Sequence, residues 1–318
     1  MPRIDHRRAA FPAIAIVIAA LFAVTTTGCI DSTGNAGPAP DLIWGVQGIE
    51  PGQLQKPRAM AIDSSDEIYL VDMTARIQVY DADGNYLRGW KTPVSVNGRP
   101  TGLSIAKNGH VWVPDTHYYR VLAYDRAGAA VEAENLGGVM GPGPGEFAWV
   151  TDVVEDSEGS IYVSEYGDTD RIQKFSRDGK FLLQWGGTGE EPGQFRRPQS
   201  MAVDKEDHIW VADACNHRIQ VFDKEGQLIN HWGQEGSSPG ELYYPYGLAF
   251  DGKGHLYVCE YGNHRVQKFD LNGKSLGTWG SHGRVPGQLH NPWAIAFDSK
   301  GRLYVLDSSN HRVQRVNF

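Results

Sequence analysis

The sequence is poor in cysteine and in basic residues. Three cysteines in 318 residues cannot supply the disulfide framework on which small secreted scaffolds depend. Lys and Arg total 30 against 38 Asp and Glu, a net charge of −8, whereas nucleic-acid-binding domains neutralise phosphates with clustered basic side chains. The sequence also has no serine-nucleophile motif, P-loop or strand-to-helix GxGxxG. We therefore expect no nucleic-acid partner and find no motif for nucleotide binding.

Long hydrophobic runs are confined to the N-terminus. Three arginines within the first eight residues precede an apolar stretch from Ala9 to Val24. This stretch contains Pro12 and is shorter than the ~20 apolar residues of a spanning helix. A basic start, an apolar segment and small residues before Gly28-Cys29 are typical of an export signal. We predict a signal peptide over residues 1–28, with an uncleaved N-terminal anchor as the alternative.

The segment Thr26-Thr27-Gly28-Cys29 resembles a bacterial lipoprotein processing site, although Thr26 stands where that family has Leu or Val. The resemblance implies lipidation of Cys29 and attachment to a membrane of the cell envelope, on its periplasmic or extracellular side. Residues 29–40 are rich in Gly, Pro and small polar residues and are predicted to be a flexible tether reaching at most ~35 to 40 Å. Without residues 1–28 the chain has 27 basic and 37 acidic residues, a net charge of −10.

A repeat extends over residues 41–318. Six copies of a short apolar segment, of the type IYLVD or LYVCE, carry an aromatic residue at the second position, and these aromatic residues are 43 to 50 positions apart: Tyr69, Trp112, Tyr162, Trp210, Tyr257 and Tyr304. Each copy contains four short alternating segments separated by Gly, Asn and Asp turns, which predicts four antiparallel strands. Four strands at this period are typical of a propeller blade. We predict an all-β, six-bladed β-propeller.

The two ends of the repeat region predict how the ring closes. The sixth copy stops after its third segment, HRVQRVNF, while residues 41–45, DLIWG, match the fourth segments of other copies. The N-terminal segment is therefore predicted to supply the outer strand of the last blade, which would remove an open sheet edge. The first strands carry mostly small residues at one core position, as expected around a crowded axis: Ala61, Ser104, Val154, Ala202, Ala249 and Ala296.

The phrases NHRIQVFD (216–223), NHRVQKFD (263–270) and NHRVQRV (310–316), with their preceding PGQF, PGEL and PGQL loops, resemble the NHL-repeat family. Blades 1 and 2 depart from the motif, with MTARIQVYD and HYYRVLAYD. The resemblance implies a propeller used as a binding platform. The family also includes amidating lyases, so the fold does not by itself decide between binding and chemistry.

Several polar residues recur in the blades, and we interpret them as scaffold. These are the histidines His217, His264 and His311, the turn histidines His110, His208 and His255, and the arginines Arg76, Arg120, Arg171, Arg218, Arg265 and Arg312. The arginines are expected to bond between blades, with the carboxylates Asp72, Asp115, Glu165, Asp213, Glu260 and Asp307 as candidate partners. Cys215 and Cys259 are interpreted as buried thiols, with a disulfide as the alternative.

The candidate ligand site consists of residues that break the repeat on the side with the long loops. At the position directly after the blade proline, which in the third blade is replaced by Val150, the six blades have Arg58, Thr101, Thr151, Gln199, Tyr246 and Trp293. Further candidates are His117, Tyr118, Tyr119, Asp152, Tyr166 and Tyr261. Amidating lyases of the family place zinc-binding His after the proline. None of the six residues here is His, so no metal or cofactor is expected.

These patterns favour an exported, lipid-anchored module that binds or senses a protein, peptide or glycan at its axial face. An enzyme of the lyase or hydrolase class is the alternative, with Asp152, Glu165 and His117 as acid or base candidates.

Overall fold

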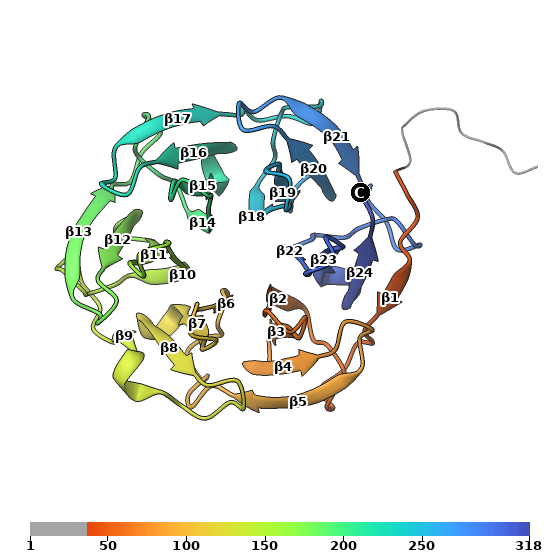
Figure 1. Cartoon of the computed structure of the whole chain (residues 1–318), viewed down its shortest axis with the longest axis horizontal. Helices are drawn as coiled ribbons and strands as arrows, with labels where there is room; N and C mark the ends of the chain where they lie inside the picture. Colours follow the sequence, from red (N-terminus) through yellow and green to blue (C-terminus); the bar gives the residue numbers. More distant parts are fainter. Residues whose placement is uncertain (1–36) are drawn as a thin grey trace, which may run out of the picture. The chain divides into compact units, whose positions relative to one another are not determined.

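Each repeat folds into a four-stranded antiparallel sheet, because short runs of apolar residues form strands and tight turns join them. The second strands of the blades are buried along nearly their whole length, as in Ile68–Asp72, whereas outer strands such as Tyr86–Lys91 have exposed positions. The computed structural model describes residues 37–318, and within them the six sheets surround one axis (Figure 1). In blades 1 to 5 the four strands follow chain order from the axis outward. The predicted six-bladed propeller is confirmed.

The strand bounds are as follows. Blade 1 has β2 (Pro57–Ile62), β3 (Ile68–Asp72), β4 (Arg76–Tyr80) and β5 (Tyr86–Lys91). Blade 2 has β6 (Ser104–Ile105), β7 (Val111–Asp115), β8 (Arg120–Tyr124) and β9 (Leu136–Gly137). Blade 3 has β10 (Trp149–Glu155), β11 (Ile161–Tyr166), β12 (Arg171–Phe175) and β13 (Phe181–Gly186).

Blade 4 has β14 (Pro198–Val203), β15 (Ile209–Asp213), β16 (Arg218–Phe222) and β17 (Leu228–Trp232). Blade 5 has β18 (Pro245–Phe250), β19 (Leu256–Glu260), β20 (Arg265–Phe269) and β21 (Ser275–Trp279). Blade 6 has β22 (Ala294–Phe297), β23 (Leu303–Asp307), β24 (Arg312–Val316) and, on its outside, β1 (Leu42–Trp44). Short 3-10 helices are η1 (Thr116–Tyr118), η2 (Glu132–Glu134), η3 (Ala214–Asn216) and η4 (Ser308–Asn310).

The ring is closed by β1, which pairs antiparallel with β24 so that Trp44 lies opposite Val313. An ion pair of 3.0 Å between Asp41 and Arg315 joins the same two segments. The predicted closure by the N-terminal strand is confirmed. It leaves β24 with a partner on both sides, because β23 occupies its inner edge.

The apolar core is divided into six clusters, and each cluster joins side chains of two neighbouring blades. A blade therefore buries both of its faces, which one sheet could not do alone. The register at the inner strands is the same in every blade: the small residue predicted near the axis pairs with the repeat aromatic, as in Ala61 with Tyr69 and Ala296 with Tyr304.

Five of the six blade arginines, all except Arg120, donate hydrogen bonds to the loops that connect blades. Each of the six pairs with the carboxylate at the end of the second strand, at 2.5 to 2.9 Å. The predicted carboxylate partners are confirmed, but each ion pair lies within one blade. The contact to the interblade loop is made to backbone carbonyls instead, as when Arg218 donates to the carbonyl oxygens of Glu190, Glu191 and Gln194.

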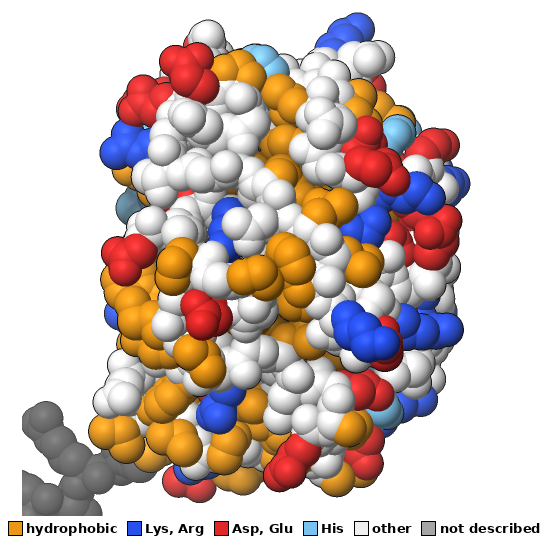
Figure 2. All heavy atoms as spheres, turned by 90° about the vertical axis from the view of Figure 1, so that its left-hand side faces the viewer, with side chains coloured by type: hydrophobic (Ala, Val, Ile, Leu, Met, Phe, Trp, Pro, Cys, Tyr) orange, Lys and Arg blue, Asp and Glu red, His pale blue; other side chains and the backbone are white. Residues whose placement is uncertain are grey.

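The two ends of the ring differ in their loops. Because the strands alternate in direction, the interblade loops and the loops after the second strands share one end, and the tight turns share the other. The interblade loops carry exposed apolar side chains: Val46, Ile49, Val94, Val96, Val139, Met140 and Val285. Figure 2, which views the outer side near β13, shows hydrophobic side chains gathered toward one end and charged ones toward the other.

Residues 1–36 lie outside the described part of the chain, and with them the predicted signal peptide, Cys29 and most of the predicted tether. Residues 37–40 precede β1, and there the Pro38 carbonyl oxygen accepts a hydrogen bond of 2.8 Å from the Trp279 indole. No helix within residues 37–318 is long and apolar enough to span a bilayer. Cys215 and Cys259, both in the described part, are free thiols, so the disulfide alternative is not realised.

Candidate functional site at the axial mouth

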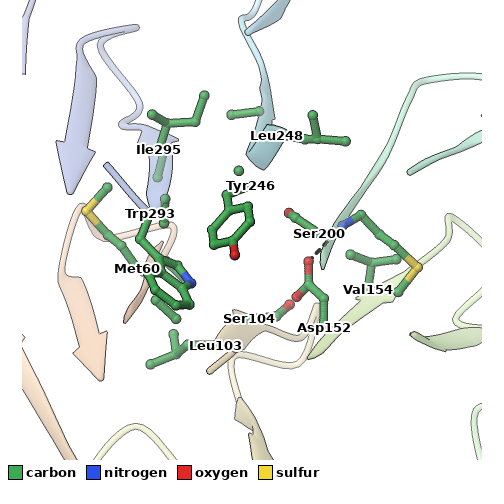
Figure 3. Close-up of a pocket in the computed structure, with 18 of the residues that line it drawn as sticks. Met60, Leu103, Ser104, Asp152, Val154, Ser200, Tyr246, Leu248, Trp293 and Ile295 are labelled. Carbon is green, nitrogen blue, oxygen red and sulfur yellow. Dashed lines mark hydrogen bonds between the residues drawn. The ribbon is translucent and has the colours of Figure 1, made fainter. Parts of the chain in front are cut away.

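A cavity of about 300 Å³ lies on the axis and takes its wall from the inner strands of all six blades. The six residues at the entry of the inner strands line it, five of them after a blade proline and Thr151 after Val150, and so does Asp152. Seven of the twelve candidates are therefore brought together at one place. Figure 3 shows Tyr246, Trp293 and Asp152 around the open centre, with the Tyr246 hydroxyl and the Trp293 indole nitrogen turned toward it.

Three of the lining residues are engaged with other parts of the structure or are buried. The Thr101 hydroxyl lies 2.8 Å from that of Thr116. The Thr151 hydroxyl donates to the Pro198 carbonyl oxygen of the next blade at 2.6 Å, and Gln199 is 3% exposed. Among the large side chains of the mouth, Arg58 and Trp293 are partly exposed, whereas Tyr246 is buried.

Aromatic and arginine side chains form the rim above the cavity. Tyr261 stacks on Tyr246 with ring centroids 4.7 Å apart, and Tyr246 meets Trp293 edge to face at 5.0 Å. The Arg58 guanidinium lies 5.4 Å from the centroid of the Trp293 ring. The rim residues thus come from blades 1, 5 and 6, and ring closure is what makes blade 1 a neighbour of blade 6.

Arg197 belongs to this rim, although the comparison of residues after each blade proline missed it. It precedes Pro198 and has a left-handed backbone with φ of 62°. Its guanidinium lies 4.9 Å from the Tyr166 ring and 5.4 Å from the Tyr246 ring, so it bridges blades 3 and 5. Aligning the residue before each proline would have included Arg197 among the candidates. In the structure, Lys56, Tyr244 and Asn291 at the same position share its positive φ.

His117, Tyr118 and Tyr119 lie in a second hollow, not in the axial cavity. This hollow, of about 450 Å³, also takes Trp149 and Arg120 into its wall. Burial lowers the pKa of His117, and the nearby positive charges of Arg58 and Arg99 act in the same direction. Its Nδ1 is buried without a hydrogen-bond partner among the described residues. The candidates thus divide between two adjacent sites.

Asp152 is the one carboxylate in the wall of the axial cavity. Burial raises its pKa to about 6, against the stabilising hydrogen bonds from the backbone N–H groups of Met201 and Val153. These donors lie 2.8 and 2.9 Å from its oxygens. A carboxyl group with this pKa can exchange a proton near neutral pH.

The other predicted acid and base candidates are not in this cavity. Glu165 is fully buried and paired with Arg171 at 2.5 Å. Neither His nor Cys lines the axial cavity. Zinc in proteins is held by His, Cys and carboxylate ligands, three or four of them together. A single carboxylate does not provide such a set, so the residues present do not fit the zinc site of the amidating lyases.

The repeated histidines have structural roles. Nδ1 of His217, His264 and His311 accepts the backbone N–H of Tyr244, Asn291 and Lys56, at 3.0 to 3.1 Å. Each of these bonds joins one blade to the next, and the scaffold interpretation is confirmed. Three groups at the tight turn of blade 4, Asp204, Glu206 and His208, lie close enough to share a cation.

The turn itself explains this last arrangement. Asp204 accepts hydrogen bonds from His208 Nδ1 at 3.0 Å and from the Trp210 indole at 2.8 Å. Asp251 and His255 repeat the first contact in blade 5 at 2.9 Å. A contact that recurs in the same turn of two blades is a feature of the hairpin.

The fold and its mouth define a six-bladed β-propeller with a cavity on its axis. Its repeats match the NHL repeat family at residues 195–222, 242–269 and 289–316. These ranges cover the first three strands of blades 4, 5 and 6. The chain therefore contains three NHL repeats within a ring of six blades.

Curated relatives share part of the chain. The peptidylglycine alpha-amidating monooxygenase of Rattus norvegicus is 40% identical over 125 residues, which are 37% of this chain and 13% of that protein. NHL repeat-containing protein 3 of Mus musculus is 29% identical over 174 residues, 49% of each chain. The chain thus spans at most about half of the length of these relatives.

Among solved structures, a streptogramin B lyase superposes with a TM-score of 0.61 at 14% identity, covering 83% of this chain and 93% of that one. At this level of identity the likeness establishes the propeller fold, and function must be argued from the site.

Proposed function

We propose that the propeller is a binding module that receives its ligand at the axial mouth and contacts the rest of a protein, peptide or glycan through the surrounding loops. The observation that carries the proposal is the convergence of repeat-breaking residues on one cavity of about 300 Å³. Ligand sites are concave, lined by aromatic and apolar groups with a few polar ones. The exposed apolar side chains of the interblade loops surround the same end.

Filling the cavity tests this proposal. Ala296 lines the cavity wall, and Ala296→Leu narrows it without removing a polar group. We expect loss of binding in a panel of short peptides and oligosaccharides followed by ligand-observed NMR. The matched control is Ala127→Leu, in an exposed tight turn at the other end. Equal binding by both variants and the unaltered protein would place the ligand elsewhere.

A lyase or hydrolase is the second candidate, and the raised pKa of Asp152 in the cavity favours it. General acid or base catalysis by one carboxyl group contributes about 10² to 10⁴-fold in rate. Asp152→Asn would then abolish turnover while the ligand still bound. A binding module would retain affinity in this variant and convert no compound of the panel.

We further propose that the module acts outside the cytoplasm, held at a membrane by an acyl group on Cys29. The export-type N-terminus supports this proposal. Mass spectrometry of the mature N-terminus tests it: an acylated Cys29 is expected, and a chain that still begins at Met1 would refute it.

A further inference from the structure

The mouth contains two arginine side chains that lack an anionic partner. Within residues 37–318, Arg58 makes neither an ion pair nor a hydrogen bond through its guanidinium. Arg197 donates through Nε to Gln199 at 2.9 Å, and neither of its terminal nitrogens has a partner in the same part of the chain. The six blade arginines, in contrast, are all paired with carboxylates. Arg99, Arg177 and Arg284 also have no ion pair within residues 37–318, and the two rim arginines differ from them because their guanidinium groups lie against the aromatic rings of the mouth.

The surroundings of Arg58 are unfavourable to its charge. Burial lowers the pKa of Arg58, and the positive charges of Arg197 and Arg99 lower it further. The side chains that oppose this shift are the phenols of Tyr166 and Tyr261, not carboxylates. Partly desolvated charges are normally paired in folded proteins. A cluster of like charges without a counter-ion is relieved when an anion binds.

A third unused donor lies beside Arg58. The Trp293 indole N–H, like those of Trp44, Trp90, Trp185 and Trp232, is buried and has no acceptor among the described residues. Its nitrogen faces the centre of the cavity (Figure 3), and Arg58 lies 5.4 Å from the centre of the Trp293 ring. A buried donor without an acceptor costs about 1 to 3 kcal/mol. An oxygen atom of a ligand placed there would accept from the indole and face the guanidinium.

We infer that the axial mouth recognises a carboxylate group of its ligand, bound by Arg58 and Arg197 with the Trp293 indole as a further donor. This inference rests on the proposed binding function and adds the chemical class of the ligand. A planar guanidinium matches a carboxylate through two parallel hydrogen bonds. The Trp293 ring lies against the Arg58 guanidinium, and the Tyr166 and Tyr246 rings lie against that of Arg197, which helps to hold both groups in place.

A titration followed through the Trp293 indole N–H resonance tests the inference on the full folded domain. The probes are succinate, galacturonate and an acidic tripeptide with blocked ends, each compared with its neutral amide or ester. Inorganic phosphate and sulfate form separate arms. We expect saturable shifts with the carboxylates, none with the neutral counterparts, and weaker binding at higher salt because the attraction is ionic.

Arg58→Gln and Arg197→Gln should each weaken carboxylate binding at least tenfold, which corresponds to the loss of one charge-assisted hydrogen bond of about 1.5 to 3 kcal/mol. Arg177→Gln is the control, because Arg177 is also without an ion pair within residues 37–318 but lies in an exposed tight turn at the other end. The affinity of the Arg177→Gln variant for carboxylates should be unchanged. Neither rim variant should unfold the protein, since the lost guanidinium contacts are few.

The outcomes separate the two proposals. Suppose that neutral peptides or sugars bind at the mouth and lose binding in Ala296→Leu, while the affinity for carboxylates is the same with and without the two arginines. The proposed binding function then stands, and the carboxylate inference is wrong. Tighter binding of phosphate or sulfate than of any carboxylate overturns the inference in favour of another oxyanion. If no probe or panel compound shifts the indole resonance, both proposals fail.

Discussion

We predict that the Trp44 side chain stabilises the closure of the ring. It lies on the closing strand β1, opposite Val313 of β24, and its ring is 4.5 Å from that of Tyr80 in blade 1. The ring also covers Gly84 in the tight turn of blade 1, where a Cβ atom would collide with it. Trp44→Ala therefore removes a contact between the last blade and the first.

The magnitude follows from burial and ring contact. Truncating a fully buried Trp to Ala costs about 3 to 5 kcal/mol, and Trp44 is partly buried against the cluster between blades 6 and 1. An aromatic pair contributes about 0.5 to 1.5 kcal/mol beyond its area. We expect a loss of about 3 kcal/mol in the free energy of unfolding, measured by urea denaturation.

Trp185→Ala is the matched control. Trp185 lies on β13 and packs in the same way on Phe222 of the next blade, at 5.8 Å, and on Gly226. Both variants should lose similar stability. However, β13 follows β12 of the same blade directly in the chain, so a tight turn holds it to its sheet. β1 is held to blade 6 through its pairing with β24.

Hydrogen exchange distinguishes the two variants. In Trp44→Ala the amides of β1 and β24 should exchange faster by a factor of about 10 to 100, because the strand detaches before the ring unfolds. In Trp185→Ala these amides should keep their protection relative to the rest of the domain. If β24 exchanges at the same relative rate in both variants, the pairing of β1 with β24 does not open before the rest of the ring, and the prediction is wrong.

Two further predictions concern buried charges. The pKa of Asp152 is raised to about 6 in the folded protein, so the folded protein holds this proton more tightly than the unfolded chain does. As the pH rises from roughly 4 to 6, ionisation of Asp152 should therefore lower the free energy of unfolding by up to about 3 kcal/mol. Asp152→Asn should remove this fall, and urea unfolding at pH 4 and pH 7 would show it; an identical pH dependence in both proteins contradicts the assignment. Asp213→Asn leaves the buried Arg218 without its counter-ion and should cost about 3 to 5 kcal/mol, seen as a large drop in melting temperature. Asp178→Asn, which breaks the exposed pair with Lys180, should leave the melting temperature unchanged, and a small effect of Asp213→Asn would show that the pair is not structural.

The site shows where reasoning from the sequence reached its limit. Comparing the residues after each proline identified positions that do line one cavity. The same comparison could not show that Thr151 bonds to Pro198 in the next blade, or that His117 turns into a separate hollow. It also passed over Arg197. The lipidation of Cys29 and the signal peptide over residues 1–28 stay predictions.

The number of blades, the four strands of each and the use of residues 41–45 to close the last sheet could all be predicted from the amino-acid sequence. These features are local: alternation, turn residues and the repeat period specify strands, and the missing outer strand is identified by its own motif. The tertiary structure alone decided which side chains meet at the mouth. Arg197 reaches both Tyr166 and Tyr246 because its left-handed backbone and the packing of blades 3, 4 and 5 direct it there. Periodicity fixes a residue's place along a strand, but the direction of a loop side chain depends on neighbours that ring closure brings from far along the chain.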